Sequence, residues 1–149
     1  MIFDTHCHGY WRGLGDRREE VRRNMLAAGV VRSIQIGADY ASSLQALELA
    51  RDWGEHTWCT AGIHPTDCQE CAPGSIPGWM EKLEETARGN RDKVVGIGET
   101  GLDYYHLVPG KEEEGKRVQR EFFAAQAELA RSLDLALVIH TRDAAADML

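Results

Sequence analysis

The chain has 149 residues, of which 43% are hydrophobic and 28% are charged, and its formal net charge is −7. This length suits one domain with a substantial core. The acidic balance argues against a protein that binds nucleic acid through a broad basic face. No apolar run is long enough to cross a bilayer, and the opening residues lack the basic and apolar regions of a secretory signal. We therefore expect a cytoplasmic protein with no membrane role.

The four cysteines, Cys7, Cys59, Cys68 and Cys71, suggest no dense disulfide framework and fit a reducing compartment. Cys68 and Cys71 form a CxxC pair, which could be half of a zinc site. No second CxxC or paired HxxxH completes such a site. We therefore expect an ordinary loop with two incidental thiols.

Five short apolar runs predict five strands, at residues 1–3, 30–37, 57–63, 93–98 and 135–140. The runs show no sustained alternation, which is typical of strands buried on both faces of a parallel sheet. Between them the sequence predicts helices at 17–29, 41–54, 76–90 and 116–133. The charged segment KEEEGKR at 111–117 is expected to form a solvated, mobile loop.

This alternation predicts an α/β fold with parallel strands, either a doubly wound sheet or a (β/α)8 barrel of the TIM type. Polar residues at or just after the ends of all five strands favour the barrel, because its catalytic face draws on several strands. These residues are His6, His8, Asp39, His64, Glu99, Asp103, His140, Arg142 and Asp143. The glycines of GIGETG at 96–101 have neither the GxGxxG spacing of a dinucleotide site nor the lysine of a P-loop.

A metal site is the leading hypothesis for these polar residues. In an extended segment, residues i and i+2 point to the same face, so His6 and His8 form a pair of imidazole ligands. Glu99 can bridge two cations with its two oxygens, and His140 ends another strand. Imidazole and carboxylate ligands together suit zinc, manganese or magnesium.

Four motifs now resemble a known family in order and spacing: DTHCHG at 4–9, AGIHP at 61–65, GETGLDYY at 98–105 and VIHTRDA at 138–144. They are similar to the motifs of the TatD family of metal-dependent deoxyribonucleases, which is related to the amidohydrolase superfamily. The resemblance implies a distorted TIM barrel that hydrolyses phosphodiester bonds in DNA. It also implies two divalent metal ions, zinc, magnesium or manganese, at the carboxyl ends of the strands.

Position by position, the resemblance implies that His6 and His8 bind one metal ion and that His140 binds the second. Glu99 is implied as the shared carboxylate and the catalytic residue. Two cations held in this way can clamp the phosphoryl oxygens and favour attack on the phosphodiester. With an acidic chain, the phosphates of a DNA substrate would have to be met locally, by metal ions and a few basic side chains.

The resemblance assigns the remaining polar residues to the surroundings of the metal ions. It implies that His64 lines the cleft and contacts a substrate phosphate, and that Asp103 orients Glu99 or a loop. Arg142 and Asp143 follow the histidine of the second metal ion. Two interpretations of Arg142 stay open: a bidentate phosphate contact, or a surface arginine paired with Asp143 or Asp147.

The chain corresponds to only part of such a barrel. An eight-stranded barrel typically needs about 250 residues, whereas this chain supplies five strands before AAADML at 144–149, which suggests the start of a helix. We therefore expect residues 1–149 to form the amino-terminal part of a single barrel, truncated to about five βα units. In the family, a further histidine ligand and a late aspartate come from the carboxyl-terminal region, and neither has a counterpart here. An exposed sheet edge would favour self-association.

Three functions follow as alternatives. The first is hydrolysis of DNA by a metal-dependent deoxyribonuclease, or by the amino-terminal part of one. The second is hydrolysis of amides or lactones, since related metal barrels share the HxH pair, although GETGLDYY and VIHTRDA argue against it. The third is a non-enzymatic remnant that binds metal or pairs with another chain.

Overall fold

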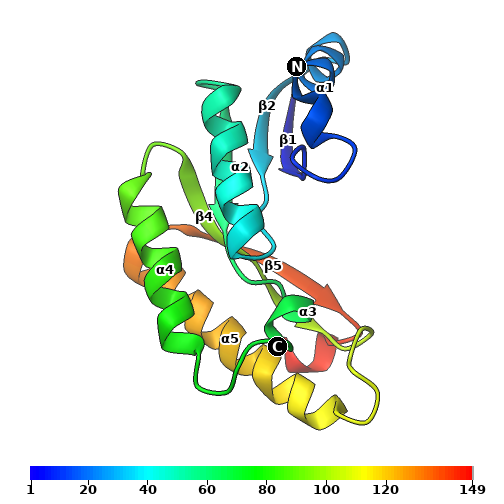
Figure 1. Ribbon diagram of the computed structural model, residues 1–149, viewed down its shortest axis with the longest axis vertical. Coiled ribbons are helices and arrows are strands. Elements are labelled where there is room, and N and C mark those ends of the chain that lie inside the picture. Colours follow the sequence, from blue (N-terminus) through cyan, green and yellow to red (C-terminus); the bar gives the residue numbers. More distant parts are fainter. Residues whose placement is uncertain (149) are drawn as a thin grey trace.

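A computed structural model describes residues 1–148 as a five-stranded parallel sheet curled into a half-barrel, with helices packed against it (Figure 1). The strands are β1 (Ile2–Cys7), β2 (Val30–Gln35), β3 (Thr57–Ala61), β4 (Val94–Asp103) and β5 (Ala136–Arg142). The helices are α1 (Arg18–Ala27), α2 (Tyr40–Asp52), α3 (Pro65–Cys68), α4 (Ile76–Gly89) and α5 (Glu112–Leu133), with short 3-10 turns at Gly15–Arg17 and Ala145–Asp147.

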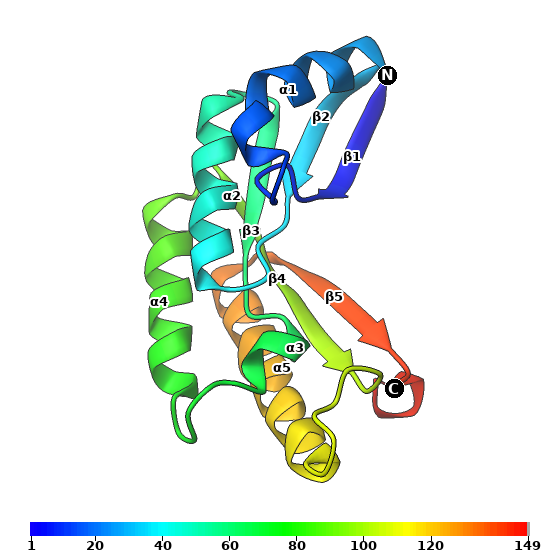
Figure 2. The same cartoon turned by 45° about the vertical axis from the view of Figure 1, so that its right-hand side comes forward.

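The order of the strands separates a barrel from a doubly wound sheet. Each strand pairs in parallel with the next one along the chain, giving the order β1-β2-β3-β4-β5. A doubly wound sheet reverses its strand order at a switch point and carries helices on both faces. Here the order never reverses, and the long helices lie along one side of the sheet (Figure 2). The predicted fold class, an α/β barrel truncated to about five βα units, is confirmed.

Three local predictions were wrong or incomplete. The segment 111–117 is not a mobile loop, because α5 begins at Glu112 and three acidic residues occupy its first turn, where they complement the positive end of the helix dipole. Strand β4 runs to Asp103, five residues beyond the predicted end, so Glu99 and Asp103 lie within it. The short helix α3 was not predicted, and the last described residues form a 3-10 turn at Ala145–Asp147.

The hydrophobic core lies between the helices and the sheet. Leu83 and Ala87 of α4 and Leu133 of α5 pack with Val94 and Ile97 of β4, and each is at most 2% exposed. Burying an aliphatic side chain of this size contributes roughly 1.5–3 kcal/mol. The core therefore fixes β4, the strand that carries the acidic residues of the candidate site.

Two fully buried glutamines on α5 hold the ends of two strands. The side-chain amide of Gln119 accepts a hydrogen bond from the backbone N–H of Asp103 (2.8 Å) and donates to its carbonyl (2.9 Å). Gln126 does the same for Ile63, just past β3, at 2.8 and 3.0 Å, and also donates to the hydroxyl of Thr100. Because buried backbone groups need partners, these amides stabilise the strand ends where a ladder hydrogen bond is lacking.

The two outer strands of the described sheet carry exposed apolar side chains. Ile2 and Phe3 on β1 are 51% and 45% exposed, and Ile139 on β5 is 50% exposed. These positions fit the expected open edges, and self-association through them stays a prediction. Within residues 1–148, no helix has the length and apolar character needed to span a membrane.

We expect Gln126→Leu to lower the free energy of unfolding by roughly 2–4 kcal/mol, because it leaves the buried N–H and carbonyl of Ile63 without their side-chain partner. Urea unfolding measures the change. The matched control is Glu128→Gln on the exposed face of the same helix, where the carboxylate contacts only Arg131 among the described ion pairs and a change within about 0.5 kcal/mol is expected. Equal stability of Gln126→Leu and the control would contradict the role of Gln126.

Candidate metal centre

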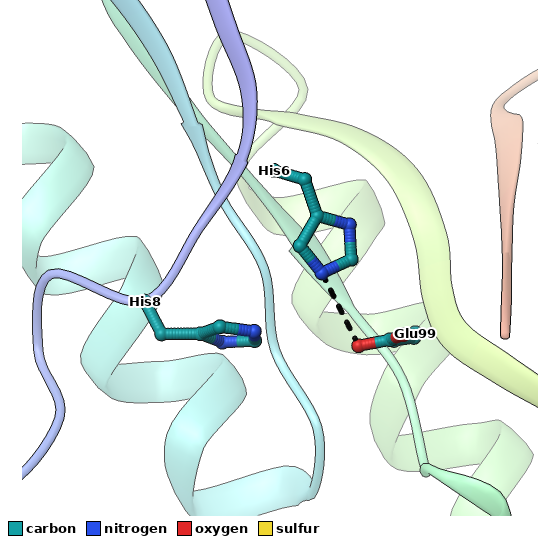
Figure 3. A group of neighbouring side chains, drawn as sticks. All are labelled: His6, His8 and Glu99. Atoms are coloured by element: carbon teal, nitrogen blue, oxygen red, sulfur yellow. Dashed lines mark ion pairs between the residues drawn. The ribbon is translucent and has the colours of Figure 1, made fainter.

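The histidine pair of β1 faces the carboxylate of β4. His6 lies on β1 and His8 directly follows it, with 5.3 Å between their ring centroids. The Nε2 atom of His6 lies 3.4 Å from Oε2 of Glu99, and one ligand atom from each of the three residues lies within 4.8 Å of the others (Figure 3). The predicted His6–His8–Glu99 group is therefore brought together across three intervening strand pairings.

Hydrogen bonding leaves one nitrogen of His8 available to a cation. Its Nδ1 lies 2.9 Å from the carbonyl of Ile36, which can only accept, so Nδ1 carries the proton and donates. The hydroxyl of Tyr10 donates to the same carbonyl at 2.5 Å. Burial lowers the pKa of His8 below its ordinary value, which keeps the ring neutral. A neutral ring with a protonated Nδ1 presents Nε2 as a ligand.

A second group forms around the other oxygen of Glu99. Nδ1 of His140, on β5, lies 3.2 Å from Oε1 of Glu99, and ligand atoms of His64, Glu99 and His140 lie within 4.8 Å of one another. The rings of His64 and His140 meet edge to face at 4.4 Å between centroids. Glu99, whose side chain is only 12% exposed, is therefore shared between two histidine groups.

Asp103 orients His140 rather than Glu99. Its Oδ2 lies 3.1 Å from Nε2 of His140 and 2.9 Å from Nδ1 of His106, and its Oδ1 accepts from the backbone N–H of His106. Burial opposes ionisation, but the hydrogen bonds from His106 and His140 lower the pKa of Asp103 below its usual value. An ionised Asp103 accepts the Nε2 proton of His140, which leaves Nδ1 facing Glu99 as the ligand nitrogen.

His64 uses its Nδ1 as a hydrogen-bond acceptor. As the N-cap of α3, its Nδ1 accepts a hydrogen bond from the backbone N–H of Thr66 at 3.2 Å. Burial, together with the neighbouring His140, lowers the pKa of His64 to about 4. A neutral ring whose Nδ1 accepts carries its proton on Nε2, so His64 presents a donor to the centre rather than a lone pair.

The donor set fits divalent cations. The first group contributes two imidazole nitrogens and the second contributes that of His140, each with an oxygen of the same carboxylate. This mixture suits zinc or manganese, and the carboxylate also suits magnesium. The hydrogen bonds to Ile36 and Asp103 supply the supporting partners that metal-binding histidines usually have. His6, His8, Glu99 and His140 are the residues that would hold the ions.

The other predicted site residues lie further out. Asp39 caps α2, where its side chain accepts from the backbone N–H of Ser42, so its role in the fold is structural. Arg142 is exposed, and its guanidinium carbon lies 3.9 Å from the ring centroid of Tyr105. Asp143 is exposed with φ +53°. The structure does not bring Arg142 or Asp143 into either histidine group.

Several contacts near the site were not predicted from the sequence. Asp147 pairs with Arg120 and Tyr104 rather than with Arg142. His106, the partner of Asp103, stands three residues after it, which is the spacing of a side chain that caps a following turn. That spacing within DYYH was the one signal that could have identified His106.

The CxxC pair takes no part in the centre. All four cysteines are free. Cys68 is buried at the end of α3 rather than in a loop, and its thiol donates to the carbonyl of Pro65. Burial raises the pKa of Cys68 to about 12, so the reactive thiolate form is suppressed.

Comparison with known proteins gives the same motifs a family context. Residues 3–149 match the family model described as TatD related DNase. The chain is 31% identical over 148 residues to an uncharacterized metal-dependent hydrolase, YabD, of Bacillus subtilis, an alignment that covers 99% of this chain and 53% of YabD. It is 35% identical over 127 residues to the 3'-5' ssDNA/RNA exonuclease TatD of Salmonella typhimurium, covering 85% of this chain and 44% of that protein.

The same fold occurs in a solved structure. The TatD homologue YJJV of Escherichia coli superposes with a TM-score of 0.83 at 24% identity, over 98% of this chain and 52% of that one. At this identity the likeness shows the fold. The chain spans about half the length of the curated relatives it matches.

We expect His6→Ala combined with His8→Ala to lower bound metal sharply, because the double change removes both imidazoles of one group. Metal content after loading with zinc or manganese and gel filtration measures the effect. His56→Ala is the matched control, since His56 is exposed and precedes β3 at the opposite end of the strands. Unchanged metal stoichiometry in the double variant would defeat the assignment.

Asp103→Asn tests the orientation of His140. The amide keeps the size of the side chain but loses the charge that holds the Nε2 proton, and we expect metal affinity to fall by roughly 10- to 100-fold. Calorimetric titration measures the affinity, and nitrogen NMR of His140 reports which ring nitrogen binds the ion. Asp143→Asn is the control. Metal bound through Nε2 of His140, or an affinity equal to that of the control, would refute the arrangement.

Proposed function

Because the chain belongs to the TatD-related DNase family of metal-dependent hydrolases, we propose that it hydrolyses phosphodiester bonds in DNA with two divalent metal ions held by His6, His8, Glu99 and His140. The observation that carries this proposal is the position of Glu99. Its two oxygens face different histidines, Oε2 toward His6 at 3.4 Å and Oε1 toward His140 at 3.2 Å. One carboxylate placed between two histidine groups is the arrangement that a bridging ligand requires.

The need for cations follows from the substrate. A phosphodiester repels an anionic nucleophile, and the candidate centre itself contains the carboxylates of Glu99 and Asp103. When bound, divalent cations supply Lewis-acid chemistry, which polarises a phosphoryl oxygen and lowers the pKa of a water molecule. The residues of the chain supply fixed geometry: His8 is oriented by the carbonyl of Ile36, and His140 is oriented by Asp103.

His64 is suited to donate a hydrogen bond to the phosphate of the substrate. Its Nδ1 accepts from Thr66, so the proton on Nε2 is available for donation to a phosphoryl oxygen. Because its pKa is lowered to about 4, the ring donates as a neutral group near pH 7 and adds no charge that would compete with the cations. The guanidinium of Arg142 lies against the ring of Tyr105, so a phosphate contact by Arg142 stays a prediction.

The substrate assignment draws on relatives as well as on the site. Relatives named as 3'-5' ssDNA/RNA exonucleases are about one-third identical to this chain. They support a nucleic-acid substrate over an amide or a lactone, the alternative that the HxH pair leaves open. The chain spans about half the length of these relatives. That residues 1–149 hydrolyse DNA by themselves is therefore also proposed.

The experiment measures hydrolysis of single-stranded DNA, labelled at either end, with manganese, magnesium or zinc and with excess chelator. We expect cleavage that requires metal, and Glu99→Gln to reduce it by at least about 100-fold, because the neutral amide cannot bridge two cations. Glu121→Gln, on the exposed face of α5, is the control and should retain activity.

Parallel assays with small amides and lactones separate the alternatives. Metal-dependent turnover of these compounds without cleavage of DNA would replace the proposed reaction by an amidohydrolase reaction. Metal binding with no turnover of any substrate would instead support the non-enzymatic alternative, a chain that binds metal or pairs with another chain.

A further inference from the structure

Trp11 is an exposed aromatic side chain held beside the candidate metal centre. It lies on the loop after β1 and is 64% exposed, with its ring centroid 5.3 Å from that of His8. The backbone N–H of Trp11 donates to the carbonyl of His8 at 3.1 Å, and its own carbonyl accepts from Leu14 and Gly15 at 2.9 Å. The main chain of Trp11 is therefore held by hydrogen bonds, and its exposed indole lies next to a predicted ligand.

The cleft that Trp11 lines is acidic. It has a volume of about 700 Å³, and His8, His64 and Glu99 also line it. Its charged lining is completed by three aspartates and one arginine: Asp16, Asp39, Asp67 and Arg12. Among the described residues that line this cleft, Arg12 is thus the single arginine or lysine. A polyanion cannot gain much affinity here from basic side chains.

We propose that Trp11 is a stacking platform for an unpaired nucleobase of the strand whose phosphodiester lies at the metal centre. The inference rests on the proposed function and adds how the substrate is held. Stacking on an aromatic ring needs no positive charge and accepts any base, because every base has a π-face. It therefore suits a cleft whose lining repels phosphate.

The same geometry selects the form of the nucleic acid. A base inside a duplex already has both faces covered by its neighbours, so it cannot also cover an indole ring. A base at an unpaired end, or in a single strand, can be splayed onto it. Because Trp11 adjoins His8, the stacked nucleotide is close to the phosphodiester held there. Trp11 thereby favours single strands over duplexes.

The test compares binding of a fluorescent decathymidylate to the Glu99→Gln protein, in which the substrate is preserved, with and without a change at Trp11. We expect Trp11→Ala to weaken binding by roughly 5- to 50-fold and Trp11→Phe to weaken it less, because phenylalanine keeps a smaller ring. Trp79→Phe on α4 is the matched control, since Trp79 is partly buried against Tyr40 outside the cleft, and it should bind as before.

An abasic residue, moved through the oligonucleotide one position at a time, identifies the stacked base. At that position the abasic strand should bind equally to the protein that retains Trp11 and to the Trp11→Ala variant, whereas abasic residues elsewhere should preserve the difference. An unchanged affinity in Trp11→Ala, or the same loss with every abasic strand, would overturn the proposal. So would a fall in unfolding free energy without a change in binding, which would make Trp11 a structural residue.

The stacking role of Trp11 and the proposed function are tested by different measurements. The proposed function is judged by metal-dependent turnover of the protein with Glu99 and Trp11 intact. The inference is judged by the relative affinities of the Trp11 variants. Turnover with equal affinities rejects the stacking role alone, and binding that depends on Trp11 without turnover rejects the hydrolytic function alone.

Discussion

The site depends on two buried amides of α5. Gln119 binds the backbone N–H and carbonyl of Asp103, and Gln126 binds those of Ile63, so one helix fixes the carboxyl ends of β4 and β3 together. Both side chains are fully buried, where an unpaired polar group would be costly. Asp103 itself orients His140, and His64 directly follows Ile63. The hydrogen bonds that satisfy the strand ends therefore also position two side chains of the candidate centre.

Electrostatics divides the histidines of the centre into two kinds. The carbonyl of Ile36 and the carboxylate of Asp103 accept hydrogen bonds from ring N–H groups of His8 and His140, leaving the opposite nitrogens for a cation. The backbone N–H of Thr66 donates to Nδ1 of His64, which leaves the ring proton on Nε2 and occupies the lone pair. A hydrogen bond to the main chain or to Asp103 therefore decides what each ring can do. His8 and His140 keep a lone pair for a cation, whereas His64 keeps an N–H donor. Proximity alone does not separate His64 from the proposed ligands, because in the second group its ligand atom lies within 4.8 Å of that of Glu99, as the ligand atom of His140 does.

The alternation of apolar runs and helical segments was enough to predict the five parallel strands, because buried strands and amphipathic helices leave distinct periods in a sequence, and the polar residues at the strand ends favoured the barrel. The length of β4 was not predictable in that way. Gly98 and Gly101 interrupt its apolar pattern, yet Gly101 adopts φ +141°, and a Cβ there would collide with the carbonyl of His140. The glycines permit close pairing of β4 with β5 instead of ending the strand. Likewise, the contact of Asp103 with His140, 37 residues further along the chain, could not be known until folding brought β4 and β5 together.

The negative charge of the chain constrains how it could treat a phosphodiester. With a formal charge of −7 and a cleft lined by aspartates, the chain gains little from long-range attraction to DNA. The charge of the phosphate would then have to be neutralised at the centre itself, where Glu99 and the histidines would hold cations. The rest of the strand would have to be bound by uncharged side chains. Trp11 lies where such contact is available, beside His8 on a loop fixed by its own backbone hydrogen bonds. An acidic surface with a local cation site and an aromatic face would bind a strand weakly when only its phosphates are accessible. It would bind more tightly a strand that offers an unpaired base to the aromatic ring and a phosphate to the cations.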